Sequence, residues 1–168
     1  MGRVTVVEST YAQVKRFIKA AEGQYYRLVL LVGMAGTGKT GFLQKLAEEF
    51  GSYVVNVNLE LSGSLLELTE KQRALHLSEQ FGRLVDQSSE APVLLDNLEV
   101  LFDKSLKQDP LRLLQIVSRN KIVVAAWNGS VVNDQLIYAE PDHFEYRGFV
   151  VADTLIVDVN GLSAANSA

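Results

Sequence analysis

Hydrophobic residues follow two alternating patterns along the first 130 residues of the chain. Short apolar runs of the kind that form buried parallel strands alternate with stretches in which apolar residues recur every three or four positions, as on one face of a helix. The runs predict strands at residues 25–32, 53–57, 92–96 and 122–126, and the helical spacing predicts helices at residues 10–21, 42–50, 64–87 and 111–118. This alternation predicts an α/β fold with a mostly parallel sheet between helices.

Residues that begin helices mark two of these boundaries. Thr10 followed by Gln13 fits a capping box that opens the first helix. Asp109 followed by Pro110 predicts an N-cap and a first helical residue. The segment at residues 98–107 fits either a helix or an irregular loop, and the pattern does not choose between them.

The pattern is less regular after residue 130. Residues 135–139 are the candidate for a fifth strand, and later extended pieces are indicated near residues 144–146 and 155–159. We therefore expect a five-stranded sheet in a single domain at residues 1–160. Residues 161–168 have the composition of a linker, which predicts a flexible tail.

Composition and charge narrow the classes of function. The 168 residues are 48% hydrophobic and 21% charged, which suits one globular domain. The formal net charge of -4 gives no electrostatic argument for binding nucleic acid over the whole surface, so direct DNA contact stays open and unsupported. The absence of cysteine excludes disulfides and thiolate metal sites. No apolar run is long enough for a bilayer, and no signal peptide is indicated, so we expect a cytoplasmic protein without membrane contact.

The strongest chemical signal is the segment GMAGTGKT at residues 33–40, hereafter the 33–40 loop, which matches G-x-x-x-x-G-K-[ST] in full. The motif predicts that backbone N–H groups surround phosphate oxygens, that Lys39 contacts the β and γ phosphates, and that Thr40 binds Mg²⁺. The expected nucleotide-contacting residues are Gly33, Met34, Ala35, Gly36, Thr37, Gly38, Lys39, Thr40 and Gly41. A chance glycine turn would not explain why the motif lies between a predicted strand and a predicted helix.

An aspartate, Asp96, ends the third predicted strand. A carboxylate at the carboxyl end of a strand beside the loop strand is suited to hold a magnesium-bound water, so Asp96 and Thr40 are the expected metal residues. The alternative is that Asp96 caps the next helix.

The residues after Asp96 bear on hydrolysis. Many P-loop ATPases that hydrolyse ATP have a glutamate next, which deprotonates the attacking water, whereas Asn97 can hold a water but cannot accept its proton. Glu99 is the nearest substitute, and its alternative role is that of a surface or helix-start acid. Asn128, after the fourth predicted strand, is placed to bridge the γ phosphate and the water, unless Asn128 and Gly129 form a simple turn. We expect slow hydrolysis.

The loop, Asp96 with Asn97, and Asn128 together resemble a minimal AAA+ ATPase core over about residues 10–140. Within that superfamily the chain is most similar to the small P-loop proteins of BREX phage-defence systems, the BrxF family, in its length, its GMAGTGKT loop, and its LLDN and AAWNGS segments. The resemblance implies a P-loop NTPase fold, and an ATPase that acts with other defence proteins in the bacterial cytosol. It also implies the sensor 1 role for Asn128.

Two features of the AAA+ pattern are missing from this sequence, the helical lid and the arginine finger. Too little chain follows residue 139 for a helical lid, and residues 129–136 contain no arginine that could reach a neighbouring subunit's γ phosphate. Arg119 and Arg112 are the substitutes that we consider. The alternative for both is a solvated arginine on a helix.

We therefore expect a protein that binds ATP and Mg²⁺, hydrolyses ATP slowly, and forms a homo-oligomer controlled by the nucleotide. A nucleotide-gated assembly module with negligible hydrolysis is the first alternative, motivated by Asn97. A small-molecule kinase is the second, and the scarcity of arginines at residues 59–87 and 129–146 counts against it. Adenine is favoured over guanine because Asn120 and Lys121 are not followed by the aspartate of the guanine-binding motif NKxD.

Overall fold

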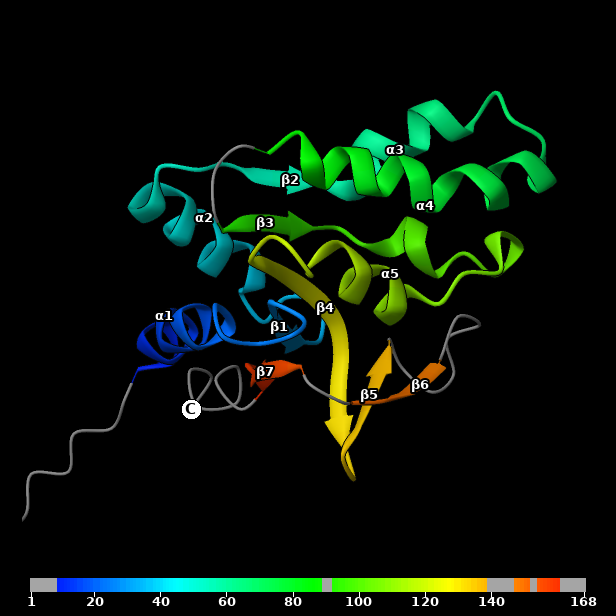
Figure 1. Ribbon diagram of the computed structural model, residues 1–168. Helices are drawn as coiled ribbons and strands as arrows, with labels where there is room; N and C mark the ends of the chain where they lie inside the picture. The colour runs from blue at the N-terminus through cyan, green and yellow to red at the C-terminus, as the bar shows by residue number, and fades with distance from the viewer. Residues whose placement is uncertain (1–8, 89–91, 139–146, 152–153, 161–168) are drawn as a thin grey trace, which may run out of the picture.

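The computed structural model describes residues 9–88, 92–138, 147–151 and 154–160. Over these ranges the chain has an α/β fold in which a mostly parallel sheet lies between helices (Figure 1). The strands are β1 (Leu28–Gly33), β2 (Val54–Asn56), β3 (Val93–Asp96), β4 (Val123–Val132), β5 (Gln135–Tyr138), β6 (Arg147–Val150) and β7 (Leu155–Asp158). The helices are α1 (Thr10–Ala21), α2 (Lys39–Phe50), α3 (Val57–Leu65), α4 (Glu70–Asp86) and α5 (Pro110–Val117), with two short 3₁₀ helices, η1 (Glu99–Phe102) and η2 (Lys104–Leu106).

Five strands form the parallel part of the sheet in the order β2-β3-β4-β1-β7. The strand expected at residues 135–139 is present as β5, but the expected total of five strands is wrong, because the described residues form a seven-stranded sheet in which β7 pairs with β1. Strand β5 instead pairs antiparallel with the far end of β4, and β6 pairs with β5. The cause is a two-residue turn at Asn133 and Asp134, whose φ angles of 51° and 62° reverse the chain into a hairpin.

The alternating side chains of β1 serve two separate layers of the core. Leu28, Leu30 and Val32 pack in the cluster that also contains residues of α3, α4 and α5. Val29 and Leu31 pack with residues of α1 and α2 on the other face. All six residues of β1 are buried, as a central parallel strand requires. The two helical layers therefore cover both faces of the sheet (Figure 1).

Most predicted elements are present, with differences at their boundaries. Ser9 rather than Thr10 caps α1, since its Oγ accepts a hydrogen bond from the N–H of Ala12 at 3.1 Å. The stretch at residues 64–87 is two helices, because Thr69 begins α4 with a capping box of its own. Residues 98–107 contain the two 3₁₀ helices.

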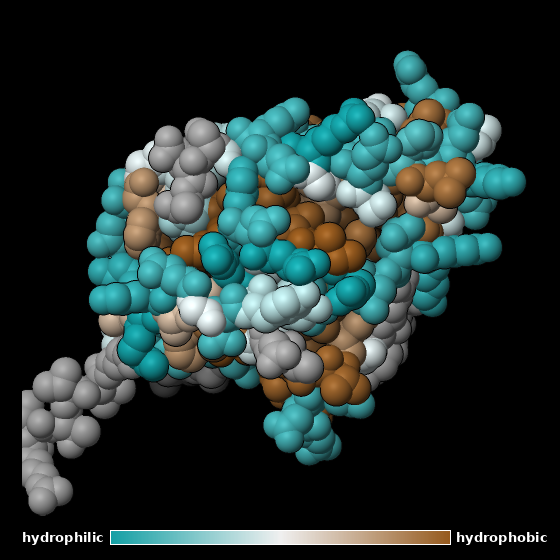
Figure 2. Space-filling model, in the orientation of Figure 1, coloured by the Kyte–Doolittle hydropathy of each residue, from teal (hydrophilic) through white to brown (hydrophobic). Residues whose placement is uncertain are grey.

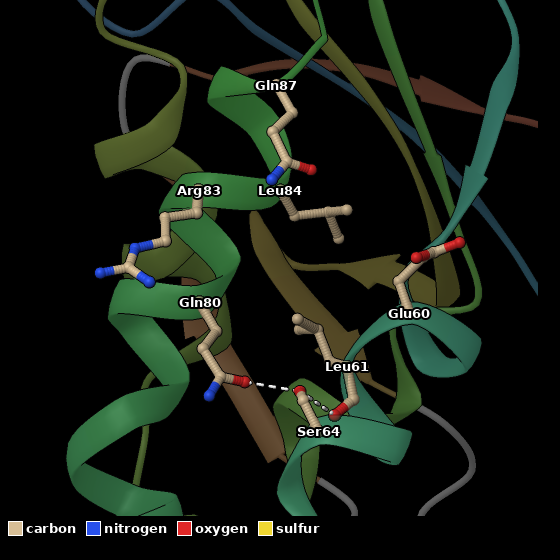
Figure 3. A pocket seen from close by; sticks show the side chains of 7 residues that line it. All are labelled: Glu60, Leu61, Ser64, Gln80, Arg83, Leu84 and Gln87. Atoms are coloured by element: carbon tan, nitrogen blue, oxygen red, sulfur yellow. Dashed lines mark hydrogen bonds between the residues drawn. The ribbon is translucent and has the colours of Figure 1, made fainter.

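Helices α3 and α4 lie against each other on one face of the sheet. The Ser64 hydroxyl donates to Gln80 Oε1 at 2.7 Å, and Leu61 and Leu84 face each other across the hollow between the two helices (Figure 3). On α5 the predicted cap is confirmed: Asp109 accepts from the N–H of Arg112 at 3.1 Å. Residues 139, 144–146 and 161–168, where further strand and tail were expected, lie outside the described residues.

Strand β4 is longer than its apolar run predicts, because it continues through Asn128 and Gly129 into the hairpin. The interpretation of these two residues as a simple turn is therefore wrong. A side chain at Gly129 would place its Cβ 1.8 Å from the carbonyl oxygen of Ile137, so only glycine fits there. The preceding Trp127 is fully buried and donates to the same carbonyl at 3.1 Å. In Figure 2, apolar side chains gather next to the polar tip of this hairpin.

Among the described residues, none of the helices has both the length and the apolar character that crossing a membrane would require.

Candidate functional site

The carboxyl ends of β1 and β3 and the middle of β4 meet at one edge of the parallel sheet and bring the candidate residues together. The 33–40 loop follows β1, and Asp96 is the last residue of β3. Gly33 and Asn128 are directly paired in the register of β1 and β4. Polar groups from three strands therefore lie side by side, as expected for a site at the carboxyl edge of a parallel sheet.

Three glycines give the 33–40 loop its shape. Gly36 and Gly38 have φ angles of 85° and 91°, which other residues adopt only with strain. At Gly33 a Cβ atom would lie 2.4 Å from Thr37 Oγ1 and 2.5 Å from a methyl group of Val159. The loop then enters α2, whose first turn has neither a side-chain cap nor an acidic residue. The free N–H groups and positive dipole at this end of the helix suit an anion.

Lys39 is folded back onto the loop that it follows. Its ammonium group donates to the carbonyl oxygens of Gly33 at 2.6 Å and Met34 at 2.9 Å, and only 6% of the residue is exposed. Burial lowers the pKa of Lys39, while the carboxylates of Asp96 and Glu99 act in the opposite direction. Its positive charge is therefore held inside the loop, next to two carboxylates.

Thr40 and Asp96 are in direct contact. The Thr40 hydroxyl donates to Asp96 Oδ2 at 2.7 Å, and Asp96 Oδ1 accepts from the N–H of Asn97 at 2.9 Å. The carboxylate is nearly buried, so its position is fixed by these two donors. A hydroxyl and a carboxylate are hard oxygen ligands of the kind that Mg²⁺ binds, so the pair fits this ion. The described residues contain no cluster of three or more His, Cys, Asp or Glu suited to a metal.

Asn97 connects the end of β3 to the start of α3. Its φ of 55° lies in the left-handed region, which asparagine tolerates better than most residues. Its carbonyl accepts from the N–H of Asn58 at 2.9 Å. The backbone of Asn97 therefore joins the end of β3 to α3, and this role is separate from any role of its side chain.

Glu99 and Asn128, two candidates from different elements, are paired. Asn128 Nδ2 donates to Glu99 Oε1 at 3.5 Å, and both residues are half-buried. Glu99 is also close enough to Lys39 to raise the pKa of that lysine. Although Glu99 begins η1, as a helix-start acid would, its carboxylate thus faces the edge that carries the 33–40 loop.

The structure does not bring the two arginines to this edge. Arg119 follows α5 at the end of the sheet where β1 and β4 begin, and its guanidinium lies 4.8 Å from the centre of the Tyr25 ring. Arg112 donates to the hydroxyl of Tyr26 at 2.7 Å, also ahead of β1. Both arginines therefore lie at the amino end of the strands, opposite to the loop.

One residue of the site was missed by sequence reasoning. Asn160, just after β7, accepts from the N–H of Met34 at 2.8 Å and donates to the carbonyl of Gly129 at 3.0 Å. The available signal was its position two residues after the last apolar run. Asp96 and Asn128 were found in this way, as polar residues that follow apolar runs. That signal required knowing that residues 155–158 form a parallel strand beside β1.

Comparison with known proteins adds no relative to this picture: no protein-family model matches the chain, and a search of curated proteins returns no match.

Proposed function

We propose that this chain binds ATP with Mg²⁺ at the 33–40 loop and hydrolyses it slowly. The observation that carries the proposal is the contact between Thr40 and Asp96 at the mouth of a glycine loop that leads into an uncapped helix. A phosphate chain needs N–H donors and a cation, and a magnesium ion needs oxygen ligands. The N–H donors, the lysine and the hydroxyl ligand lie in the 33–40 loop, and the carboxylate ligand ends β3. Contrary to what the sequence led us to expect, strand β3 does not lie directly beside the loop strand β1, because β4 lies between them.

Binding requires a change at Lys39. The ammonium group bonds the carbonyls of Gly33 and Met34 in the free protein, so it would turn from these acceptors to phosphate oxygens. Phosphate charge favours the protonated amine, which offsets the lowering of its pKa by burial. Thr40 and Asp96 would hold the magnesium ion, which neutralises charge on the phosphates.

Hydrolysis in this proposal depends on Glu99. Asn97 cannot accept a proton, while the carboxylate of Glu99 lies beside Asn128, whose amide is suited to orient a water. The pair combines a proton acceptor with a hydrogen-bonding group at the level of Gly33. Its contact is long and comes from a 3₁₀ helix, so the geometry has to tighten when nucleotide is bound.

The resemblance to BREX proteins extends the proposal to assembly. Because Arg112 and Arg119 lie at the opposite end of the sheet, either of them would contact a γ phosphate only on a second copy of the chain. We propose that ATP promotes such a homo-oligomer, within a phage-defence complex. Asn97 favours one alternative, a module that assembles on ATP and hydrolyses almost none.

The direct test is nucleotide binding by the variant Lys39→Ala. We expect its affinity for ATP to fall at least 100-fold, because a charge-assisted contact of about 3 kcal/mol is lost. Titration calorimetry with ATP, with and without Mg²⁺, measures the effect.

Lys45→Ala is the matched control, since it removes an exposed lysine from the same helix and should bind ATP like the unaltered protein. Wild-type affinity in Lys39→Ala would contradict nucleotide binding at this loop.

A further inference from the structure

Asn160 joins two parts of the candidate site that are far apart in the sequence. Its Oδ1 accepts from Met34 N at 2.8 Å, and its Nδ2 donates to the carbonyl oxygen of Gly129 at 3.0 Å. Met34 is the second residue of the 33–40 loop, and Gly129 directly follows Asn128. One side-chain amide thus ties the loop to β4, and it needs both an acceptor and a donor to do so.

The position of Asn160 is itself fixed by the end of β7. Its backbone N–H donates to Asp158 Oδ1 at 3.0 Å, and the N–H of Val159 donates to the carbonyl of Val32 at 2.8 Å. The Val159 side chain is fully buried against Gly33, where no room for a Cβ remains. Asn160 therefore contacts the loop from a segment that is bonded to the strand carrying the loop.

The carbonyl group of Met34, in the next peptide group, is held by residues of the loop itself. Its carbonyl accepts from Thr37 Oγ1 at 2.7 Å and from the Lys39 ammonium at 2.9 Å. When Lys39 turns to a phosphate, the Met34 carbonyl loses that donor, whereas the bond from its N–H to Asn160 does not involve the lysine. The first turn of the loop then relies on Asn160 and Thr37.

We propose that Asn160 is a positioning residue of the nucleotide site. It holds the first turn of the 33–40 loop at a fixed place relative to Asn128, so that the loop is arranged for phosphate before nucleotide arrives. Such preorganisation strengthens binding by removing the cost of ordering the loop on contact. This inference rests on the proposed nucleotide binding at the same loop.

The experiment compares Asn160→Ala and Asn160→Asp with the unaltered chain. Amide hydrogen exchange reports the protection of Met34 N–H, and titration calorimetry reports ADP affinity, in about 0.5 M salt to screen the added carboxylate. Alanine removes both hydrogen bonds, whereas aspartate keeps the acceptor for Met34 and lacks the donor for Gly129. Asn120→Ala, at an exposed asparagine before β4, is the control.

In Asn160→Ala we expect faster exchange of Met34 and about 5-fold to 10-fold weaker ADP binding, the effect of losing one or two net hydrogen bonds. The rates of amide hydrogen exchange within β1 and β3 should stay unchanged. A general loss of stability would raise them. Asn160→Asp should restore the protection of Met34 but only part of the affinity, because it lacks the donor for Gly129.

Two results would overturn the role of Asn160. One is wild-type ADP affinity in Asn160→Ala, and the other is ADP binding in Asn160→Asp that is no stronger than in Asn160→Ala although the protection of Met34 is restored. Lys39→Ala keeps this inference separate from the proposed function. If Lys39→Ala binds nucleotide normally, the function fails, whereas loss of binding there with normal Asn160→Ala refutes the positioning role alone.

Discussion

At the scale of single residues, the site is defined by how charge is distributed around the 33–40 loop. Lys39 is bonded to backbone carbonyls, Asp96 to a hydroxyl and an N–H group, and Glu99 to an amide. No two of these three charged groups form a direct ion pair among the described contacts. Each can therefore turn to a ligand without leaving an opposite charge unpaired, which would be costly in a buried site.

The pairing of Glu99 with Asn128 leads to a prediction about turnover. Glu99→Gln keeps the size and hydrogen bonding of the side chain but removes its ability to take a proton, so we expect ATP hydrolysis to fall about 100-fold. ATP affinity should be retained. Phosphate release under single-turnover conditions measures the rate.

Glu67→Gln is the control for this prediction, since Glu67 is an exposed acid in the turn between α3 and α4. An unchanged rate in Glu99→Gln would exclude Glu99 as the proton acceptor and favour the module that barely hydrolyses ATP.

At the scale of elements, β4 and its hairpin differ most from what the sequence indicates. Ten residues form this strand, and the last part leaves the parallel sheet to pair with β5. Phe102, Trp127, Tyr138 and Phe149 pack as an aromatic cluster that bridges η1, β4, β5 and β6. This cluster anchors the antiparallel extension to the main core.

Gly129 is the most constrained position of the strand, and its substitution should be destabilising. In Gly129→Ala the new methyl group would meet the carbonyl of Ile137, so we expect a loss of at least 2 kcal/mol in unfolding free energy. Gly82→Ala is the opposite case, because α4 leaves open space there and alanine favours a helix by about 1 kcal/mol. Urea denaturation of both variants measures the difference. Equal stabilities would contradict the tight packing at Gly129.

The sequence predicts the loop and the strands around it well because their signals are local. The glycines of the 33–40 loop and the apolar run before Asp96 need no tertiary information. The order of strands depends on contacts between distant residues, and so the sequence did not predict that β7 pairs with β1 or that β5 pairs antiparallel with β4. Asn160 was missed for the same reason, since its partners Met34 and Gly129 are distant in sequence. A single asparagine has no local pattern that distinguishes it.

At the scale of the whole molecule, the two ends of the sheet have different roles in the proposal. The loop, Asp96 and Asn128 lie at the carboxyl end of the strands, and Arg119 lies at the amino end beside Tyr25. In one possible assembly, the amino ends of the strands in one copy contact the carboxyl ends of the strands in the next. Such a contact is heterologous, and heterologous contacts build rings or filaments.

This arrangement makes activity depend on concentration. We expect ATP turnover per subunit to fall on dilution, and Arg119→Ala to reduce turnover while ATP affinity is retained, because in the proposed oligomer the arginine would act on a neighbouring subunit. Arg83→Ala, at an exposed arginine of α4, is the control. Light scattering without nucleotide, with ADP and with a non-hydrolysable ATP analogue measures the assembly. Turnover strictly proportional to protein concentration down to the monomer would refute this proposal.

The continuity of β4 has a mechanical consequence. Asn128 and the exposed Val132 belong to one uninterrupted strand, about 13 Å apart at the usual rise of a strand. No loop separates them to absorb movement, so a shift of the strand at Asn128 is carried to the outer end of the hairpin. Under the proposed function, a shift of Asn128 on nucleotide binding would therefore move the tip of the hairpin, where a neighbouring molecule could contact it.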